Sequence, residues 1–242
     1  MRLDQALVVR GLCESRTEAQ LLIEEGAVLV NGVVCSKQTR NVLDGDAIET
    51  TKRRRYVSRG GDKLEGVFLD VFGESVAIEM LRGIVALDIG SSTGGFTDYL
   101  IQHGAADVDA VDVGTLQFHA SLRDDKRIHL YENTDIRTFV SDKQYNVIVA
   151  DLSFISLSEM LPVVTSFATK DVTTFFLLIK PQFEVGKGNT KKGIVKDDAL
   201  VREVLNTVEV LAKGLGIKSI KVFPCHIRGG DGNQEYFLYG TF

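Results

Sequence analysis

The sequence predicts an α/β fold preceded by a small α+β module. Residues 63–242 alternate apolar, strand-like runs with helical patterns, which is typical of βαβ units and a mostly parallel sheet. A Gly-rich loop follows one of these runs, as in open sheets that bind a nucleotide-like ligand. Residues 1–50 instead combine two helical patterns with a hairpin signal. We therefore divide the chain into residues 1–50, a linker at 51–62, and residues 63–242.

The composition is that of an ordinary folded protein. The chain has 242 residues, of which 44% are hydrophobic and 25% charged. No apolar run approaches the roughly 20 residues that a membrane helix needs, and the first residues lack the pattern of a signal peptide. We therefore expect a cytoplasmic protein without a membrane partner.

The cysteines bear on whether the chain has disulfides or a metal site, and the charges bear on whether it binds nucleic acid. Cys13, Cys35 and Cys225 are too widely spaced for a disulfide framework or a metal site, so buried thiols and no metal are expected. The net charge of −5 does not by itself indicate nucleic-acid binding. The basic run at residues 52–55 is a candidate RNA footprint, and it fits a solvated linker equally well.

Two short helices are expected near the amino terminus. Apolar residues with helical spacing favour a first helix within residues 3–10, which ends at Gly11. A second helix is capped by Ser15 or Thr17 and ends at Gly26.

A β-hairpin follows these helices. Residues 27–34 form two short apolar runs around Asn31-Gly32, and this dipeptide is the strongest short-range hairpin signal because both residues tolerate positive φ. Asp44-Gly45-Asp46 forms a further turn before residues 47–49. Two helices that lead into a hairpin make a unit near the lower size limit for independent folding.

This module resembles the RNA-binding domain named after the small-subunit ribosomal protein S-four. The resemblance rests on Arg2-Leu3-Asp4, Ser15-Arg16, residues 26–32 and residues 44–46. It implies binding to structured RNA, which proteins recognise mainly through shape, phosphates and 2′-hydroxyls. The cationic residues expected to contact RNA are Arg2, Arg10, Arg16, Lys37, Arg53, Arg54 and Arg55.

The second region contains the elements of an α/β sheet. Strands are expected at 84–88, 108–113, 145–150, 174–179 and 218–223. Helices are expected at 98–102, 157–168 and 197–215. The aromatic run at 235–239 closely follows the preceding strand, which favours an antiparallel strand at the sheet edge.

The Gly-rich loop lies in the segment from Val85 to Thr97. Its pattern is Gly-x-x-x-Gly-Gly, whereas a dinucleotide site requires Gly-x-Gly-x-x-Gly, so NAD is disfavoured. Glycines allow the backbone to approach a ligand, and free amides at a helix start favour anionic groups. Asp112, after the next strand, is placed to accept hydrogen bonds from ribose hydroxyls.

The segment Asp-x-Gly-x-x-x-Gly-Gly-Phe-Thr resembles the first motif of FtsJ-type ribose methyltransferases. The resemblance implies a Rossmann-like domain that uses S-adenosylmethionine (SAM), with Asp112 on the ribose and Asp135 near the adenine. The residues implied in cofactor binding are Asp88, Gly90, Ser91, Thr93, Gly94, Gly95, Phe96, Asp112 and Asp135.

Methylation of a ribose requires a base, because a 2′-hydroxyl is a weak acid. A lysine serves only if its pKa falls well below about 10.4. Asp151 and Lys180 each end an apolar strand at the ligand edge of the predicted sheet. Lys63 and Glu235 lie in Gly-rich segments, and any of these four charges taken alone is more often a surface residue.

The set Lys63, Asp151, Lys180 and Glu235 resembles the Lys-Asp-Lys-Glu tetrad of FtsJ-type enzymes. The segments 56–64, 151–157, 180–186 and 232–236 resemble those of the TlyA family, also called hemolysin A, over essentially the whole chain. That family is associated with 2′-O-methylation of cytidines in ribosomal RNA and, under its older name, with hemolysis. The resemblance implies ribosomal RNA or ribosomal subunits as partners. Glu184 is the rival for the acidic role, and the resemblance favours Glu235.

The mechanistic hypothesis assigns a role to each member of the tetrad. Lys180 takes the proton of the 2′-hydroxyl, Asp151 orients Lys180, Lys63 stabilises the developing alkoxide, and Glu235 positions Lys63 or the ribose. Three alternatives remain open: a noncatalytic RNA-binding or ribosome-assembly factor, a membrane-active hemolysin, and a methyltransferase with another acceptor. Acceptor choice depends on loops that the sequence does not reveal.

Overall fold

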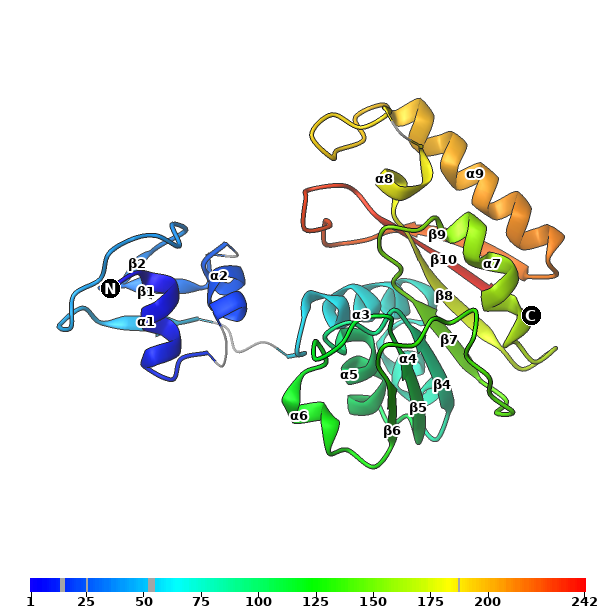
Figure 1. Ribbon diagram of the computed structural model, residues 1–242, viewed down its shortest axis with the longest axis horizontal. Coiled ribbons are helices and arrows are strands. Elements are labelled where there is room, and N and C mark those ends of the chain that lie inside the picture. Colours follow the sequence, from blue (N-terminus) through cyan, green and yellow to red (C-terminus); the bar gives the residue numbers. More distant parts are fainter. Residues whose placement is uncertain (14–15, 25, 52–54, 187) are drawn as a thin grey trace. The chain divides into compact units, whose positions relative to one another are not determined.

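The chain forms two compact units, Met1–Arg54 and Arg55–Phe242 (Figure 1). This computed structural model describes residues 1–242 except 14–15, 25, 52–54 and 187. The side chains of residues 17, 21, 74 and 78 are also outside the description. Residues 55–62, which the sequence placed in a linker, make their contacts within the second unit. The amide of Val57, for example, donates to Asp98 Oδ2 at 2.7 Å.

The first unit consists of two helices and a three-stranded sheet. Its elements are α1 (Leu3–Val9), α2 (Arg16–Glu24), β1 (Val28–Val30), β2 (Val33–Val34) and β3 (Ile48–Thr50), with strand order β2-β1-β3 and antiparallel pairing. The expected hairpin is present, since β1 and β2 pair in antiparallel register. Asn31 and Gly32 form its turn, with φ of 53° and 77°. The capping position before α2 falls on residue 15, outside the described residues.

The second unit is built around a seven-stranded sheet. Its helices are α3 (Arg59–Phe72), α4 (Glu74–Met80), α5 (Gly95–Gln102), α6 (Ala120–Arg123), α7 (Leu157–Ser166), α8 (Pro181–Glu184) and α9 (Asp198–Gly214). Its strands are β4 (Val85–Ile89), β5 (Asp107–Val111), β6 (Ile128–Tyr131), β7 (Val147–Ala150), β8 (Thr174–Ile179), β9 (Lys218–Pro224) and β10 (Tyr236–Thr241). The strand order is β6-β5-β4-β7-β8-β10-β9.

The strand order reverses at β4, and this reversal positions the site. β5 and β6 lie on one side of β4, β7 and β8 lie on the other, and all of these neighbours pair in parallel. Ligands of open α/β sheets bind beyond the carboxyl ends of the strands at such a switch point. The loop expected to bind the cofactor leaves β4 at this position.

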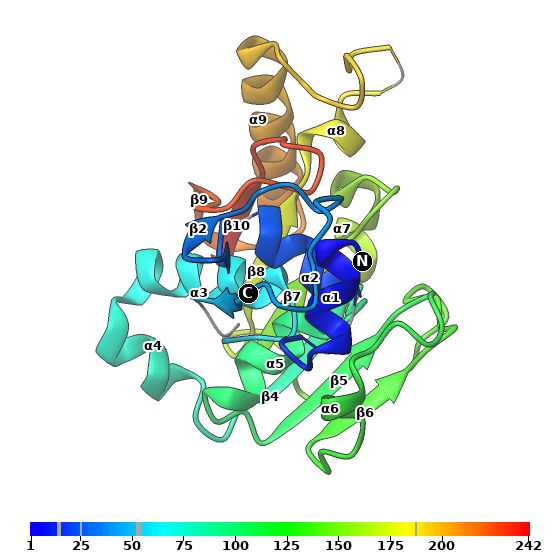
Figure 2. The same ribbon diagram turned by 90° about the vertical axis from the view of Figure 1, so that its left-hand side faces the viewer.

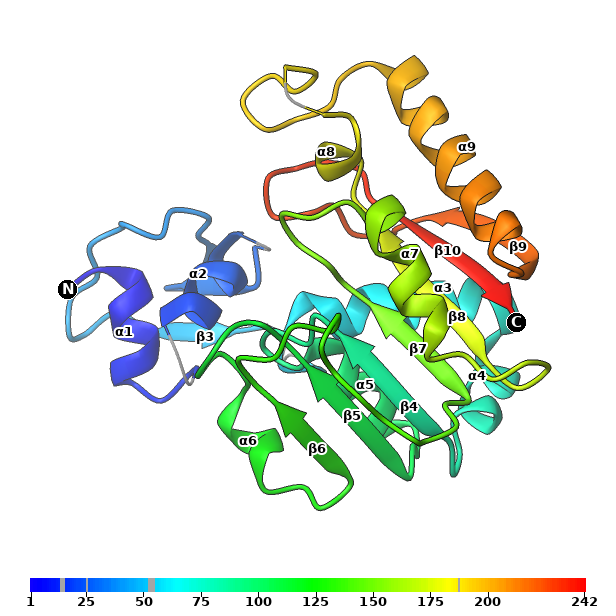
Figure 3. The same cartoon turned by 45° about the vertical axis from the view of Figure 1, so that its right-hand side comes forward.

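Helices cover both faces of the sheet, as Figures 1 and 3 show. On one face α3, α4 and α5 pack around Phe68, whose ring stacks on Phe176 of β8 with centroids 4.0 Å apart. On the other face α7 and α9 bury Leu161 and Val208 against the sheet. The alternating pattern in the sequence therefore predicted the fold class correctly.

Two differences from the sequence prediction have physical causes. β10 is not an edge strand, since it lies between β8 and β9 and is antiparallel to both. The helix α3 was not predicted, because Gly60-Gly61 near its start reads as a linker. Gly61 is required there, since a Cβ at this position would overlap the Tyr56 ring.

A buried carboxylate organises the first unit. Asp4 has no exposed surface and accepts hydrogen bonds from Arg2, Arg16 and Gln20 at 2.9–3.1 Å. The hydrogen bond from Arg2 is the main reason that the pKa of Asp4 lies well below its usual range. The side chains of Arg2 and Arg16 remain 38% and 50% exposed.

We expect Asp4→Asn to destabilise the first unit by about 2 kcal/mol at pH 7, because charge-assisted hydrogen bonds are replaced by weaker ones. A lowered folded-state pKa means that this stabilisation is present above the unfolded-state value near 3.9 and is lost as the pH falls below it. Hydrogen exchange of amides in residues 1–50 at pH 7 measures the loss. Asp44→Asn, at an exposed position of the same unit, is the control. Equal protection in both variants would contradict the role of Asp4.

Candidate active site

A cavity of about 450 Å³ lies at the carboxyl ends of β4, β5 and β7. This volume is within the range of about 300–1,000 Å³ that small-ligand sites have. The cavity is lined by Ile89, Gly90, Ser92, Val111, Asp112, Val113, Gly114, Gln117, Thr134, Asp135, Ile136, Arg137, Asp151, Leu152, Ser153, Phe154, Ile155 and Met160. Apolar side chains and carboxylates therefore surround the same space.

The loop after β4 is tightly packed. Gly90 has φ of 80°, and a Cβ there would lie 2.6 Å from the carbonyl oxygen of Asp151. Gly94 has φ of 90° and abuts Phe118 and Leu122. Side chains at either position would displace the loop, so both glycines are needed for its path.

The start of α5 contacts the start of α3 through glycines. A Cβ on Gly95 would overlap Ser58 Oγ and would lie 3.0 Å from the amide nitrogen of Gly61 and 3.1 Å from the Cα of Gly60. The helix that follows the cofactor loop is thereby in van der Waals contact with the helix that carries Lys63.

Asp88 lies buried behind the loop that follows β4 and does not line the cavity. Its side chain is fully buried, and its Oδ2 accepts a hydrogen bond from Thr97 Oγ1 at 2.6 Å. Burial is the main reason that the pKa of Asp88 is raised to about 7. Its Oδ1 has no hydrogen-bond partner among the described residues.

Two further predicted carboxylates face the cavity. Asp112 accepts hydrogen bonds from the amides of Ser92 and Gly114 at 2.7 and 2.6 Å, which fixes the carboxylate at the end of β5. Asp135 forms an ion pair with Arg137, and hydrogen bonding from this guanidinium lowers the pKa of Asp135 to about 2. Both carboxylates are acceptors for ligand hydroxyl or amino groups.

The predicted cofactor residues thus divide into two groups. Gly90, Asp112 and Asp135 line the cavity. Asp88, Ser91, Thr93, Gly94, Gly95 and Phe96 are not among its lining residues, and their part in cofactor binding stays a prediction. Phe96, for example, belongs to the core beside Phe237, because α5 turns its first residues toward the sheet.

The four predicted catalytic residues form two buried ion pairs. Lys63 Nζ lies 2.5 Å from Glu235 Oε2, and Lys180 Nζ lies 2.6 Å from Asp151 Oδ1. Lys63 and Lys180 are only 8% and 9% exposed, which is rare for lysine unless it is paired. Ser153 Oγ accepts a hydrogen bond from Lys180 Nζ at 2.7 Å.

Strand pairing brings the two ion pairs to one sheet edge. Asp151 directly follows β7 and Lys180 directly follows β8, which is parallel to β7. Tyr236 of β10 is paired with Ile179 of β8 in antiparallel register, so Glu235 lies opposite Lys180. Gln182 Nε2 also reaches Glu235 Oε1 at 3.5 Å.

Glu184 has a structural role. Its carboxylate accepts hydrogen bonds from Ser156 Oγ, the amide of Leu157 and Ser158 Oγ at 2.6–2.8 Å, at the start of α7. With its oxygens occupied in this way, Glu184 does not compete with Glu235 for a position beside Lys63.

Sequence reasoning missed two residues beside the tetrad. Ser153, which accepts from Lys180, could have been suspected only from its distance to Asp151 along the chain. Phe154 lines the cavity, is 91% exposed, has φ of 66° and packs against Phe183 with centroids 5.3 Å apart. An exposed aromatic residue with positive φ is a signal that only the structure provides.

The predicted RNA-binding residues are largely engaged within their own unit. Arg2 and Arg16 pair with Asp4, and Arg10 donates to backbone carbonyls of residues 43, 44 and 46. Lys37 is exposed. Arg55 pairs with Glu65 in the second unit, and Arg53 and Arg54 lie outside the described residues.

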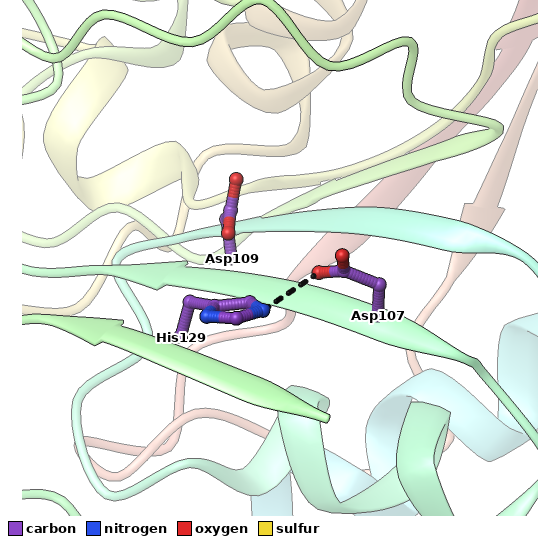
Figure 4. Close-up of side chains that lie close together, drawn as sticks. All are labelled: Asp107, Asp109 and His129. Atoms are coloured by element: carbon purple, nitrogen blue, oxygen red, sulfur yellow. Dashed lines mark ion pairs between the residues drawn. The ribbon is translucent and has the colours of Figure 1, made fainter. Parts of the chain in front are cut away.

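A cluster of Asp107, Asp109 and His129 on β5 and β6 resembles a metal site in composition (Figure 4). Lys143 Nζ is 2.7 Å from Asp107 and 2.8 Å from Asp109, so an ammonium group already lies between the two carboxylates, where a metal ion would have to bind. Tyr145 Oη donates to Asp109 at 2.5 Å. We therefore assign no metal to this cluster.

A second, more open depression of about 630 Å³ lies between residues 136–144 and α7. It contains none of the predicted site residues.

Comparisons with known proteins identify the family. The FtsJ-like methyltransferase family matches residues 56–242, and the S4 domain family matches residues 1–48. The 16S/23S rRNA (cytidine-2'-O)-methyltransferase TlyA of Mycobacterium tuberculosis is 41% identical over 98% of this chain and 88% of its own length. The chain belongs to the TlyA family of FtsJ-like methyltransferases. A relative named Hemolysin A, from Brachyspira hyodysenteriae, is 38% identical over 99% of each chain.

Solved structures agree with this membership. A candidate hemolysin from Streptococcus thermophilus has a TM-score of 0.74 and 35% identity, and the match covers 100% of this chain and 88% of that one. A candidate S-adenosylmethionine-dependent methyltransferase from Listeria monocytogenes shares the fold with a TM-score of 0.53 at 14% identity, covering 76% of this chain and 99% of that one. No helix within the described residues is long and apolar enough to cross a membrane.

The buried Asp88 makes a pH dependence testable. Its pKa of about 7 in the folded protein compares with 3.8 for an unperturbed carboxyl, so between these values the folded chain binds one more proton than the unfolded chain. The free energy of unfolding therefore falls as the pH rises through this window, by up to about 1.4 kcal/mol per pH unit. Asp88→Asn should lose this dependence, and Asp142→Asn, at an exposed position, should retain it. Urea unfolding from pH 4.5 to pH 7.5 measures the difference, and parallel curves for all three proteins would contradict it.

Proposed function

We propose that this protein transfers a methyl group from S-adenosylmethionine to the 2′-hydroxyl of a cytidine in ribosomal RNA. The convergence of two buried lysine–carboxylate pairs beside the ligand cavity is the observation that carries the proposal. The names of the TlyA relatives, which specify cytidine-2'-O-methylation of rRNA, support the choice of acceptor. An rRNA substrate supports a cytoplasmic location for the protein.

The cavity suits the cofactor. Gly90 lets the loop after β4 pass close to the Asp151 carbonyl, which any side chain would meet, and Asp112 and Asp135 supply acceptors for ribose and adenine groups. Apolar side chains such as Ile136 and Met160 complete a wall suited to a planar base. When bound, S-adenosylmethionine supplies a methyl group activated by a sulfonium.

Lys180 is placed to act as the base. A neutral amine has two N–H bonds and one lone pair. Ser153 Oγ accepts one of those N–H bonds, and Asp151 Oδ1 lies 2.6 Å from the same nitrogen. With Nζ held by these two contacts, its lone pair can accept the proton of the 2′-hydroxyl. Alignment by two fixed partners lowers the entropic cost of reaching that geometry.

Lys63 is placed to stabilise the oxygen that loses this proton. Its ammonium is held by Glu235, which lies opposite Lys180 in the β8–β10 register. A fixed cation in a buried site stabilises developing negative charge more strongly than one in water. Glu235 compensates the buried charge of Lys63 before the RNA arrives.

The first unit supplies RNA affinity in this proposal. Its match to the S4 domain family, together with the exposed parts of Arg2, Arg16 and Lys37, supports contacts with rRNA phosphates. The partner is rRNA, either free or within a ribosomal subunit.

We expect Asp112→Asn to weaken S-adenosylmethionine binding at least about tenfold, because the amide would turn a donor toward the amides of Ser92 or Gly114 and distort the acceptor site. Titration calorimetry with S-adenosylmethionine measures the affinity. Asp124→Asn, at an exposed position after α6, should bind as the wild type does. Unchanged affinity in Asp112→Asn would remove Asp112 from the cofactor site.

We expect Lys180→Ala and Lys180→Arg to reduce methyl transfer to ribosomal subunits by a factor on the order of 10²–10⁴, with S-adenosylmethionine affinity retained. The arginine variant keeps a positive charge beside Asp151 but cannot accept a proton, so it separates a base from a counter-ion. Transfer of labelled methyl to subunits from cells that lack the protein, followed by mapping of the modified ribose, is the measurement.

Lys170→Ala, an exposed lysine at the opposite end of β8, is the matched control and should retain full turnover. Wild-type turnover in Lys180→Arg would exclude Lys180 as the base. No methyl transfer by the wild type despite cofactor binding would instead favour another acceptor or a noncatalytic RNA-binding role.

A further inference from the structure

A lysine-rich segment stands out in an otherwise acidic unit. Residues 55–242 carry 20 Lys/Arg and 25 Asp/Glu, yet residues 185–196 contain four lysines and no acid. Within this segment Lys191, Lys192 and Lys196 are exposed. Among the described residues no acid forms an ion pair with any of them, whereas Lys63, Lys143 and Lys180 are all paired.

The segment has a defined backbone. The amide of Lys191 donates to the carbonyl of Ile194 at 2.9 Å, and the amide of Ile194 donates back to Lys191 at 3.1 Å. Lys192 and Gly193 between them have φ of 53° and 78°, as in a type I′ turn. We call residues 191–196 the lysine hairpin. It lies in the connection between α8 and α9, which can be followed in Figures 1 and 2.

A buried side chain fastens the lysine hairpin to the catalytic edge. Asn233 is 2% exposed, its Oδ1 accepts from the amide of Val195 at 3.0 Å, and its Nδ2 donates to the carbonyl of Gly193 at 2.9 Å. Asn233 precedes Glu235 by two residues. A primary amide satisfies one donor and one acceptor of the hairpin together, which no apolar side chain of this size can do.

Both chain segments that hold the lysine hairpin also carry tetrad residues. The hairpin follows Lys180 through the short helix α8, and its anchor precedes Glu235 at the start of β10. The backbone that carries its three lysines is therefore anchored next to the segment that carries Glu235. A fixed backbone lowers the conformational entropy that phosphate binding would otherwise cost.

We propose that the lysine hairpin binds the phosphate backbone of ribosomal RNA next to the target nucleotide and, through Asn233, sets the position of that nucleotide over the tetrad. The inference rests on the proposed function and adds an RNA contact in the catalytic unit, separate from the S4 domain. Lysine–phosphate contacts carry no sequence information, so the hairpin contributes affinity and register. Unpaired lysines are complementary in charge to a polyanion and not to a basic or an apolar partner.

The test compares two charge reversals in the full chain. Lys191→Glu/Lys192→Glu alters the hairpin, and Lys170→Glu/Lys213→Glu makes the same change in net charge at the opposite end of the sheet. Binding to ribosomal subunits is measured from 50 to 200 mM salt. The hairpin variant should bind on the order of tenfold more weakly at low salt, and its slope of log affinity against log salt should be shallower by about 1.4–1.8, as expected for two lost phosphate contacts. The control pair should match the wild type.

Measurements of methyl transfer and of cofactor affinity distinguish failure of the hairpin proposal from failure of the proposed function. The hairpin variant should bind S-adenosylmethionine as the wild type does and should require a higher subunit concentration for half-maximal methylation. If the wild type methylates subunits and the two reversals have equal affinity and slope, the hairpin proposal is overturned while the proposed function stands. If the wild type methylates no subunit, the proposed function fails first.

Asn233→Ala tests the anchor separately. This variant retains all three lysines, so its salt slope should equal that of the wild type, but turnover on saturating subunits should fall because the bound RNA is no longer placed over the tetrad. Wild-type turnover in Asn233→Ala would overturn the positioning role of Asn233. Intact cofactor affinity in the variant shows that the fold of the second unit is preserved.

Discussion

The antiparallel insertion of β10 between β8 and β9 is the constraint on which the catalytic edge depends. In a parallel sheet, residues reach the carboxyl edge only by following a strand, as Asp151 and Lys180 do. Because β10 runs in the opposite direction, the residue before it, Glu235, arrives at the same edge. A slip of one residue in this pairing would turn Glu235 to the other face and leave Lys63 without its carboxylate.

Charge burial makes the four tetrad residues mutually dependent. An isolated ammonium or carboxylate costs several kcal/mol to bury, and a partner at hydrogen-bond distance offsets much of this cost. Lys63 with Glu235, and Lys180 with Asp151, meet this requirement within the protein itself. The partners of both lysines are therefore in place before RNA binds, and little reorganisation is needed as charge develops on the acceptor oxygen of the proposed reaction.

Local patterns predicted the fold well wherever one interaction dominates. Asn31-Gly32 identified a hairpin, and the apolar run Thr174–Ile179 coincides with β8. The patterns failed where a tertiary contact decides the residue type. Gly61 reads as linker, yet it lies in the first turn of α3, where the Tyr56 ring leaves no room for a side chain. Likewise, the spacing of the cofactor motif does not reveal that Asp88 lies beneath the loop.

The glycine contact between α3 and α5 couples the loop after β4 to the helix that carries Lys63. The backbone around Gly60 and Gly61 lies against Gly95, where a Cβ would lie 3.0 Å from the amide nitrogen of Gly61, so the helix bearing Lys63 and the helix that follows the loop after β4 are in direct backbone contact. Close-packed interiors transmit displacement instead of absorbing it. A shift of the loop after β4 would therefore move the helix that carries Lys63, so the position of that ammonium depends on the conformation of the loop.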